Sequence, residues 1–316
     1  MTGTASPSRV GLIGAPTDVG AADRGASMGP QALRIAGLAK ALTELGHGVA
    51  DHGDLHGPDN PEEEPRDGFR HLREVNAWCG ILREGVRGVL RQGELPVIMG
   101  GDHCLSIGSI AGVADHCAET EQPLSVIWLD AHADFNTPVS TPSGNIHGMP
   151  LAALCGRLVA DQIEIGQHGA VIEASQVHLV GIRSVDSVEK SAIVKAGIQV
   201  YDMRTIDEHG MVAVMRRILE AVAATGGHLH VSFDVDFLDP GIAPAVGTTV
   251  PGGASFREAH LCMEMVHESG LLRSLDLVEL NPFLDVRGET ARLMVDLVGS
   301  AFGKQIVHRT PPRGAR

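Results

Sequence analysis

Short apolar runs rich in β-branched residues alternate with longer segments of helical period along this chain, and no other feature of the sequence constrains its fold as much. Repetition of strand and helix is typical of α/β folds, in which the strands run parallel. Residues 126–129 are continuously apolar, as expected for a strand that is covered on both faces. The predicted strands cover residues 9–14, 48–51, 95–99, 125–130, 176–181, 199–201, 228–234 and 274–279.

The segments between these runs predict helices, which right-handed crossovers would place on both faces of the sheet. The predicted helices cover residues 30–45, 69–91, 107–117, 190–196, 211–223 and 257–269. Residues 56–68 are rich in Pro, Asp and Glu and are interpreted as a surface loop, and residues 308–316 as a mobile basic tail. We therefore expect one α/β domain that spans residues 1–316.

The charge balance argues against two classes of partner. Twenty-five Lys and Arg residues against 39 Asp and Glu give a net charge of −14, which disfavours nucleic acid and anionic membrane. Residues 1–9 lack the apolar core of a signal peptide, and the five cysteines have no spacing typical of disulfides or zinc. We expect a cytoplasmic protein with reduced thiols.

Acidic and imidazole side chains follow four of the predicted strands, where open α/β sheets bind their ligands. The sequence GGDH occupies residues 100–103, DAHAD residues 130–134 and DVD residues 234–236, and Glu279 ends the last predicted strand. Alternate residues of an extended segment project to one side, so the acidic and imidazole groups within 130–134 can converge.

Each segment alone also has a simpler interpretation. A His after two glycines is often a turn residue, residues 130–134 could be a solvated acidic turn, and Glu279 could be a cap or an ion-pair partner. The aspartates at 234 and 236 have apolar neighbours, and two carboxylates so placed repel each other unless a cation lies between them.

Taken together, the segments supply four aspartates and two histidines to one edge of the sheet. A set rich in oxygen, with some imidazole and no thiolate, is typical of manganese or a similar divalent ion. Four negative charges match two dications better than one. Because a water molecule that bridges two such ions loses a proton near neutral pH, the predicted chemistry is metal-assisted hydrolysis. The candidate ligands are His103, Asp130, His132, Asp134, Asp234 and Asp236.

The same segments resemble those of the arginase branch of the ureohydrolase family. The matching motifs are GGDH at 100–103, DAHADFNTP at 130–138, SGNIHG at 143–148, SFDVDFLDP at 232–240 and VELNP at 278–282, in the family's order. The resemblance implies a three-layer α/β/α fold with an eight-stranded parallel sheet, a binuclear manganese centre, and a homotrimer or homohexamer. The implied reaction is hydrolysis of L-arginine to L-ornithine and urea by a hydroxide that bridges the two manganese ions.

The resemblance also implies roles for individual residues. One manganese would be bound by His103, Asp130, Asp134 and Asp234, and the other by Asp130, His132, Asp234 and Asp236. Asp134 would also accept a hydrogen bond from the hydroxide, His147 would shuttle protons, and Glu279 would hold the guanidinium. The expected substrate-binding residues are Asn136, Ser143 and Asn145 for the α-carboxylate, Asp186 and Glu189 for the α-amino group, and Thr248 near the guanidinium.

Two alternatives share many of these features. A related ureohydrolase acting on agmatine or guanidinobutyrate would keep every metal ligand, and only residues 136–145 and 186–189 distinguish it. Here Ser187-Val188 replaces a Pro-Gly pair that is frequent in the family, which bears on selectivity for the amino acid. A catalytically silent binding module is disfavoured because all six ligand positions, His147 and Glu279 remain.

Overall fold

The computed structural model describes residues 8–158 and 170–306, and its centre is a single sheet of eight strands. The strand order is β2-β1-β3-β8-β7-β4-β5-β6, and every pairing is parallel. The strands are β1 (Arg9–Gly14), β2 (Gly48–Asp54), β3 (Leu95–Met99), β4 (Leu124–Leu129), β5 (Val177–Ile182), β6 (Gln199–Asp202), β7 (His228–Asp234) and β8 (Leu272–Val278).

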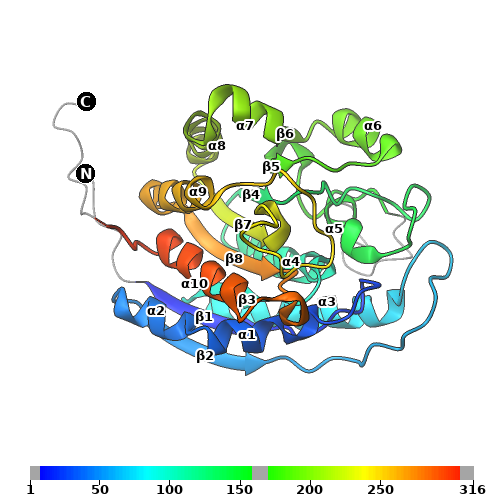
Figure 1. Ribbon diagram of the computed structural model, residues 1–316, viewed down its shortest axis with the longest axis horizontal. Helices are drawn as coiled ribbons and strands as arrows, with labels where there is room; N and C mark the ends of the chain where they lie inside the picture. The colour runs from blue at the N-terminus through cyan, green and yellow to red at the C-terminus, as the bar shows by residue number, and fades with distance from the viewer. Residues whose placement is uncertain (1–7, 159–169, 307–316) are drawn as a thin grey trace.

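Helices cover both faces of the sheet, so the fold has three layers (Figure 1). One apolar core joins the sheet to α1 (Gly29–Ile35), α2 (Leu38–Glu44), α7 (Met203–His209), α8 (Met211–Thr225), α9 (Phe256–Ser269) and α10 (Glu289–Ala301). A second core lies on the other face against α3 (Leu72–Arg91), α4 (Ser106–Glu119), α5 (Pro150–Leu154) and α6 (Ser187–Ala196). β4, β5 and β7 are buried along their whole length, as the continuously apolar runs predicted. The predicted α/β/α fold is confirmed.

All eight predicted strands are present, with ends that differ by at most three residues, but one predicted helix was wrong. The segment 30–45 is two helices, α1 and α2, because Gly37 adopts φ 93° between them. This left-handed conformation is accessible to glycine at little cost and ends the first helix. Three helices, α5, α7 and α10, were not predicted at all.

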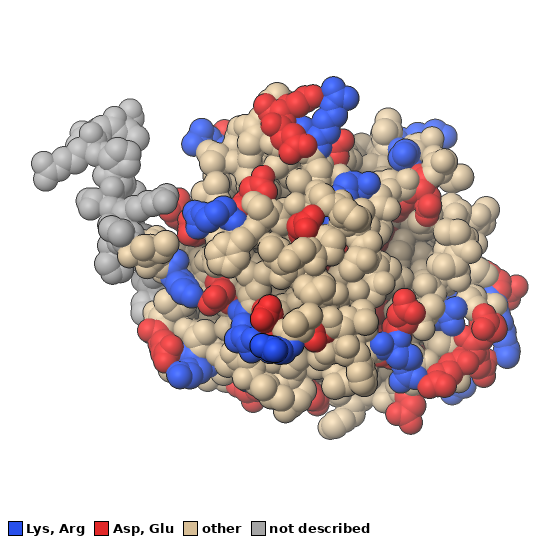
Figure 2. All heavy atoms as spheres, in the orientation of Figure 1, with Lys and Arg blue, Asp and Glu red and all other residues tan. Residues whose placement is uncertain are grey.

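The segment that was expected to be a surface loop adds no helix or strand to the sheet. Residues 56–65 have no regular secondary structure, and the predicted tail at 308–316 lies outside the described residues. Within the described ranges, none of the helices has the length and apolar character needed to cross a bilayer. On the face shown in Figure 2, acidic and basic side chains are interspersed.

Candidate metal centre

The order of the strands explains why the predicted ligands meet. β3, β8, β7 and β4 are consecutive neighbours in the middle of the sheet, and each is followed by one of the four chemistry-bearing segments. Because all four strands are parallel, their carboxyl ends lie at the same edge. Segments separated by as many as 176 residues therefore come together, as the 2.8 Å hydrogen bond from the His103 amide to Glu279 shows.

The first group of ligand atoms surrounds His103. Its Nδ1 lies 3.1 Å from an oxygen of Asp130, 3.1 Å from Asp134 and 3.0 Å from Asp234. The same nitrogen is buried and makes no hydrogen bond of good geometry. A ring nitrogen that faces three carboxylate oxygens without a true hydrogen bond is the arrangement expected of atoms that share a cation.

The second group lies beside the first and shares Asp130 with it. His132 Nδ1 is 2.9 Å from Asp236 Oδ2 and 3.5 Å from Asp130 Oδ1. The ligand atoms of Asp130, His132 and Asp236 lie within 4.8 Å of one another, as do those of His103, Asp130 and Asp134. All six predicted ligands are thus assembled into two adjoining groups.

Backbone amides and one indole hold the carboxylates in place. Asp130 Oδ1 accepts from the His132 amide at 2.6 Å, and its Oδ2 accepts from Trp128 Nε1 at 2.9 Å. Asp234 Oδ1 accepts from the Asp236 amide at 2.8 Å, which leaves Oδ2 directed at His103. Fixing one oxygen by the backbone aims the other at the cation and restricts the rotamer before any ion binds.

Local backbone strain marks two of the site residues. Asp134 has φ 49° and Glu279 has φ 64°, in the left-handed region that non-glycine residues seldom adopt. Gly101 is required because the backbone of another segment approaches it closely. Its φ is not positive, but a Cβ there would lie 1.6 Å from the carbonyl oxygen of Thr17.

The electrostatics of the cluster require positive charge. Burial, together with the charge of Asp130, raises the pKa of Asp134 to about 7. Burial and the charges of Asp236 and Asp130 raise the pKa of Asp234 well above its usual range. Burial alone would lower the pKa of His132, but Asp130 and Asp236 outweigh it and raise that pKa to about 12. Without an ion, the cluster therefore retains protons.

The groups open into a cavity of about 350 Å³, and the predicted proton carrier faces the same space. His147 Nδ1 lies 3.0 Å from Glu279 Oε1, which also accepts from the His103 amide at 2.8 Å. Burial opposes protonation of His147, but the hydrogen bond and charge of Glu279 raise its pKa to about 9. The same pairing outweighs burial and lowers the pKa of Glu279. At neutral pH the two residues form an ion pair.

The predicted substrate-binding residues line this cavity, but several have other partners. Asn136 Nδ2 donates to Asp186 Oδ2 at 3.0 Å, and Thr248 Oγ1 donates to Asp236 Oδ2 at 3.2 Å. Glu189 Oε1 accepts from the Phe135 amide at 2.7 Å, and its Oε2 accepts from the Asp186 amide at 3.1 Å. Both oxygens of Glu189 thus hold the backbone of the cavity wall. Ser143 and Asn145 also line the cavity.

Some residues of the site were not predicted from the sequence. Thr141 and Ser184 line the cavity, and both stand within two residues of a predicted position, which was the available signal. Arg183 is held against the ligand loop, where its Nη2 donates to the carbonyls of Asp236 at 2.6 Å and Val250 at 2.7 Å. This role of Arg183 could not be predicted from the sequence, because the carbonyl groups that it contacts lie in another segment.

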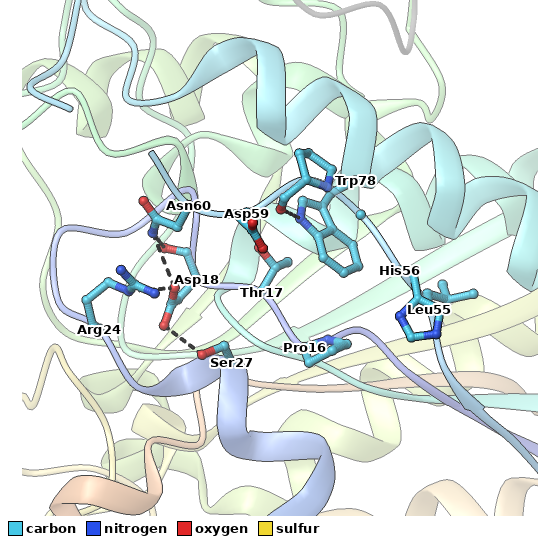
Figure 3. Close-up of a pocket in the computed structure, with 12 residues that line it drawn as sticks. Pro16, Thr17, Asp18, Arg24, Ser27, Leu55, His56, Asp59, Asn60 and Trp78 are labelled. Atoms are coloured by element: carbon cyan, nitrogen blue, oxygen red, sulfur yellow. Dashed lines mark hydrogen bonds and ion pairs between the residues drawn. The ribbon is translucent and has the colours of Figure 1, made fainter. Parts of the chain in front are cut away.

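A second cavity, of about 260 Å³, lies between residues 16–27 and the loop after β2 (Figure 3). Its buried carboxylate, Asp18, accepts from the Gly25 amide at 2.8 Å and Ser27 Oγ at 2.9 Å, and pairs with Arg24. Those partners lie within the protein and satisfy the buried charge. The carbonyl of Gly20 in this segment accepts from the His147 amide at 3.2 Å. The hydrogen bonds around Asp18 therefore help to fix the backbone beside the metal cavity.

Comparison with known proteins agrees with this geometry. A model of the arginase family matches residues 8–303. An arginase of Brucella suis is 48% identical over 299 residues, covering 94% of this chain and 97% of its own. An arginase of Bacillus caldovelox is 41% identical over 300 residues, covering 94% of this chain and 99% of its own. The solved structure of the Bacillus caldovelox arginase superimposes with a TM-score of 0.89 at 40% identity, covering 95% of this chain and all of that one.

These matches confirm the family resemblance and the predicted enzyme class, an arginase-type hydrolase. They extend over nearly the whole of the described chain and include every segment that contributes to the metal centre. The chain therefore belongs to the arginase family.

Proposed function

We propose that the protein hydrolyses L-arginine to L-ornithine and urea and holds two Mn²⁺ ions. The observation that supports this most is the pair of His/Asp groups that share Asp130 and contribute both histidines to the lining of one cavity. Carboxylate oxygens and imidazole nitrogens, without thiolate, are a donor set that Mn²⁺ accepts. When bound, two dications supply a nucleophile by lowering the pKa of a water molecule between them.

The family resemblance implies the ligand sets, and the two groups support them. His103, Asp130, Asp134 and Asp234 would hold one ion, and Asp130, His132, Asp234 and Asp236 the other, with Asp130 and Asp234 as bridges. Their orientation by backbone amides fits this role, because each bonded carboxylate keeps an oxygen directed at an imidazole. Asp134 faces the cavity and would accept a hydrogen bond from the nucleophile.

Glu279 and His147 would act on the substrate. A guanidinium stays protonated at physiological pH, so the site needs an anion to hold it and a group to protonate the departing amine. The contacts described for Glu279 fall on Oε1, and its Oε2 can face the guanidinium. His147 lies beside it with its pKa raised to about 9, so it carries a proton at neutral pH and can deliver it to the amine.

Selectivity for the amino acid would come from the rim of the cavity. Asn136, Ser143 and Asn145 offer hydrogen-bonding groups for the α-carboxylate, and Asp186 offers a carboxylate for the α-amino group. Glu189 would support Asp186 through its backbone, and Thr248 would support Asp236 near the guanidinium. We further propose a single domain and a cytoplasmic location, as the sequence indicated, and a homotrimer or homohexamer, as the family resemblance implies.

A comparison of urea release from different guanidines tests this function. Protein loaded with Mn²⁺ is assayed with arginine, agmatine and guanidinobutyrate at equal concentrations, before and after exhaustive treatment with a chelator. We expect arginine to be strongly preferred and activity to return when Mn²⁺ is added back. Preference for agmatine or guanidinobutyrate would identify the alternative ureohydrolase. Protein with two bound ions that releases urea from none of the three would be the silent binding module.

A further inference from the structure

A chain of buried polar side chains leads away from the metal centre into the core. His103 Nε2 lies 2.8 Å from Ser232 Oγ, which lies 3.3 Å from Ser106 Oγ. Ser106 Oγ in turn donates to Asp276 Oδ2 at 2.9 Å. All four side chains are at most 1% exposed. Buried polar groups are costly unless they are bonded to one another, so a network this deep calls for an explanation.

Asp276 ends this series of hydrogen bonds on the side away from the metal centre. Its carboxylate accepts hydrogen bonds from serines of α4. Ser109 Oγ also donates to Asp276 Oδ2, and His230 Nε2 lies 3.3 Å from the same oxygen. Burial acts to raise the pKa of Asp276, but His230, Ser109 and Ser106 outweigh it and lower that pKa. Asp276 is therefore ionised at neutral pH and can only accept hydrogen bonds.

An acceptor at one end of such a chain fixes the direction of every hydrogen bond in it. The single hydroxyl proton of Ser106 goes to Asp276, so Ser106 Oγ must accept from Ser232. The hydroxyl proton of Ser232 is then committed, so Ser232 Oγ must accept from His103. His103 consequently keeps its proton on Nε2 and can present the lone pair of Nδ1 to the three carboxylate-bearing residues around it.

We infer that Asp276 is a positioning residue for the metal centre, which acts through Ser106 and Ser232 to hold His103 in the tautomer that can bind an ion. This inference rests on the proposed metal site and assigns a role to residues that touch neither the ion nor the substrate. If the chain of hydrogen bonds is cut, the Ser232 hydroxyl is free to donate to His103 Nε2. That would stabilise the tautomer with its proton on Nδ1, which cannot ligate.

Two serines of α4 provide a matched pair of variants. Ser106 and Ser109 are both fully buried and both donate to Asp276 Oδ2, but only Ser106 also contacts Ser232. Ser106→Ala and Ser109→Ala thus remove the same hydroxyl from the same carboxylate oxygen. The first cuts the connection to His103, and the second leaves it intact.

The experiment measures Mn²⁺ dissociation constants by titration calorimetry for the wild-type protein and both variants, with urea unfolding of their metal-free forms in parallel. We expect Ser106→Ala to weaken binding of one of the two ions by about tenfold, at the low end of the range for outer-shell partners of metal ligands. Ser109→Ala should stay within about twofold of wild type while losing comparable stability. Asp276→Asn, whose amide can donate to Ser106 and reverse the chain, should weaken binding at least as much as Ser106→Ala.

Four results would overturn the inference. Wild-type affinity in Ser106→Ala, or an equal loss in both serine variants, would show that the chain of hydrogen bonds does not orient His103. Wild-type affinity in Asp276→Asn would show that the carboxylate does not set its direction. A wild-type protein that binds no Mn²⁺ would instead refute the proposed metal site, and this inference with it.

Discussion

Removal of the metal should make the stability of the protein fall as the pH rises from about 5 to about 7.5. The carboxyl of Asp134 has its pKa raised from 3.8 to about 7 by burial and the charge of Asp130. A group whose pKa is higher in the folded than in the unfolded state contributes stability at low pH, and that contribution is lost as the pH rises through the folded pKa. At about 1.4 kcal/mol per pH unit, Asp134 alone should cost the metal-free protein about 2.5 kcal/mol over this interval.

Other groups of the cluster should also make the free energy of unfolding fall as the pH rises. The pKa values of Asp234 and Asp236 are raised, chiefly by burial, and those of His132 and His147 are raised by their carboxylate partners despite burial. As the pH rises, each of these groups loses its proton in the unfolded chain before it does so in the folded state. Bound dications replace these protons, so the metal-loaded protein should lack this loss of stability.

The assay is urea unfolding, followed by circular dichroism, of chelator-treated and Mn²⁺-saturated protein at several pH values from about 5 to about 7.5. Asp134→Asn is the matched control, because it keeps the size of the side chain but does not titrate. In its metal-free form the decline should be smaller by about 2.5 kcal/mol than in the wild type. A metal-free wild-type protein whose unfolding free energy stays constant or rises over this interval would refute the electrostatic reasoning.

Three further predictions concern the metal and the substrate. Asp234→Ala should lose bound Mn²⁺ and urea release together, and two ions per chain in this variant, counted by elemental analysis, would contradict the bridge. His147→Ala should lower kcat by about 10²- to 10⁴-fold, the usual share of general acid–base catalysis, and an unchanged kcat in steady-state assays would remove His147 from the mechanism. Ser143→Ala should raise KM for arginine by about tenfold, the effect of one hydrogen bond to a charged group, but should leave KM for agmatine nearly unchanged. Equal changes for both substrates would show that this loop does not contact the α-carboxylate.

The strands could be predicted from the sequence better than the helices, for physical reasons that differ between elements. A strand buried on both faces needs a short apolar run, and the runs of β4, β5 and β7 can be recognised without reference to neighbouring segments. The helix α10 was missed because Gly288 occupies its N-cap position, and the side chain that accepts from its first amides, Asp285, lies three residues earlier. The division between α1 and α2 depends on the left-handed conformation of Gly37, whereas a single glycine within a helical pattern is often tolerated.

For the site, the residues that follow strands were predictable, but their mutual contacts were not. Asp130 and Asp234 are recognisable because each ends an apolar run, yet only the order of the strands brings them to the same imidazole. That order is absent from local sequence, because β4 and β7 are neighbours although about a hundred residues of chain separate them.

The buried hydrogen-bond network behind the site was harder still to predict from the sequence, for the same reason. Ser232 and Asp276 are register partners on β7 and β8, so their side chains lie on the same side of the sheet, where Ser106 of α4 connects them. In the sequence, neither residue stands out within its own strand, because β7 also contains His228 and His230 and β8 also contains Ser274. Only pairing in this register turns two such residues into donor and acceptor of one chain of hydrogen bonds. A polar residue that interrupts a buried strand beside a metal-binding segment should therefore be examined for a partner on the adjacent strand before it is assigned to packing.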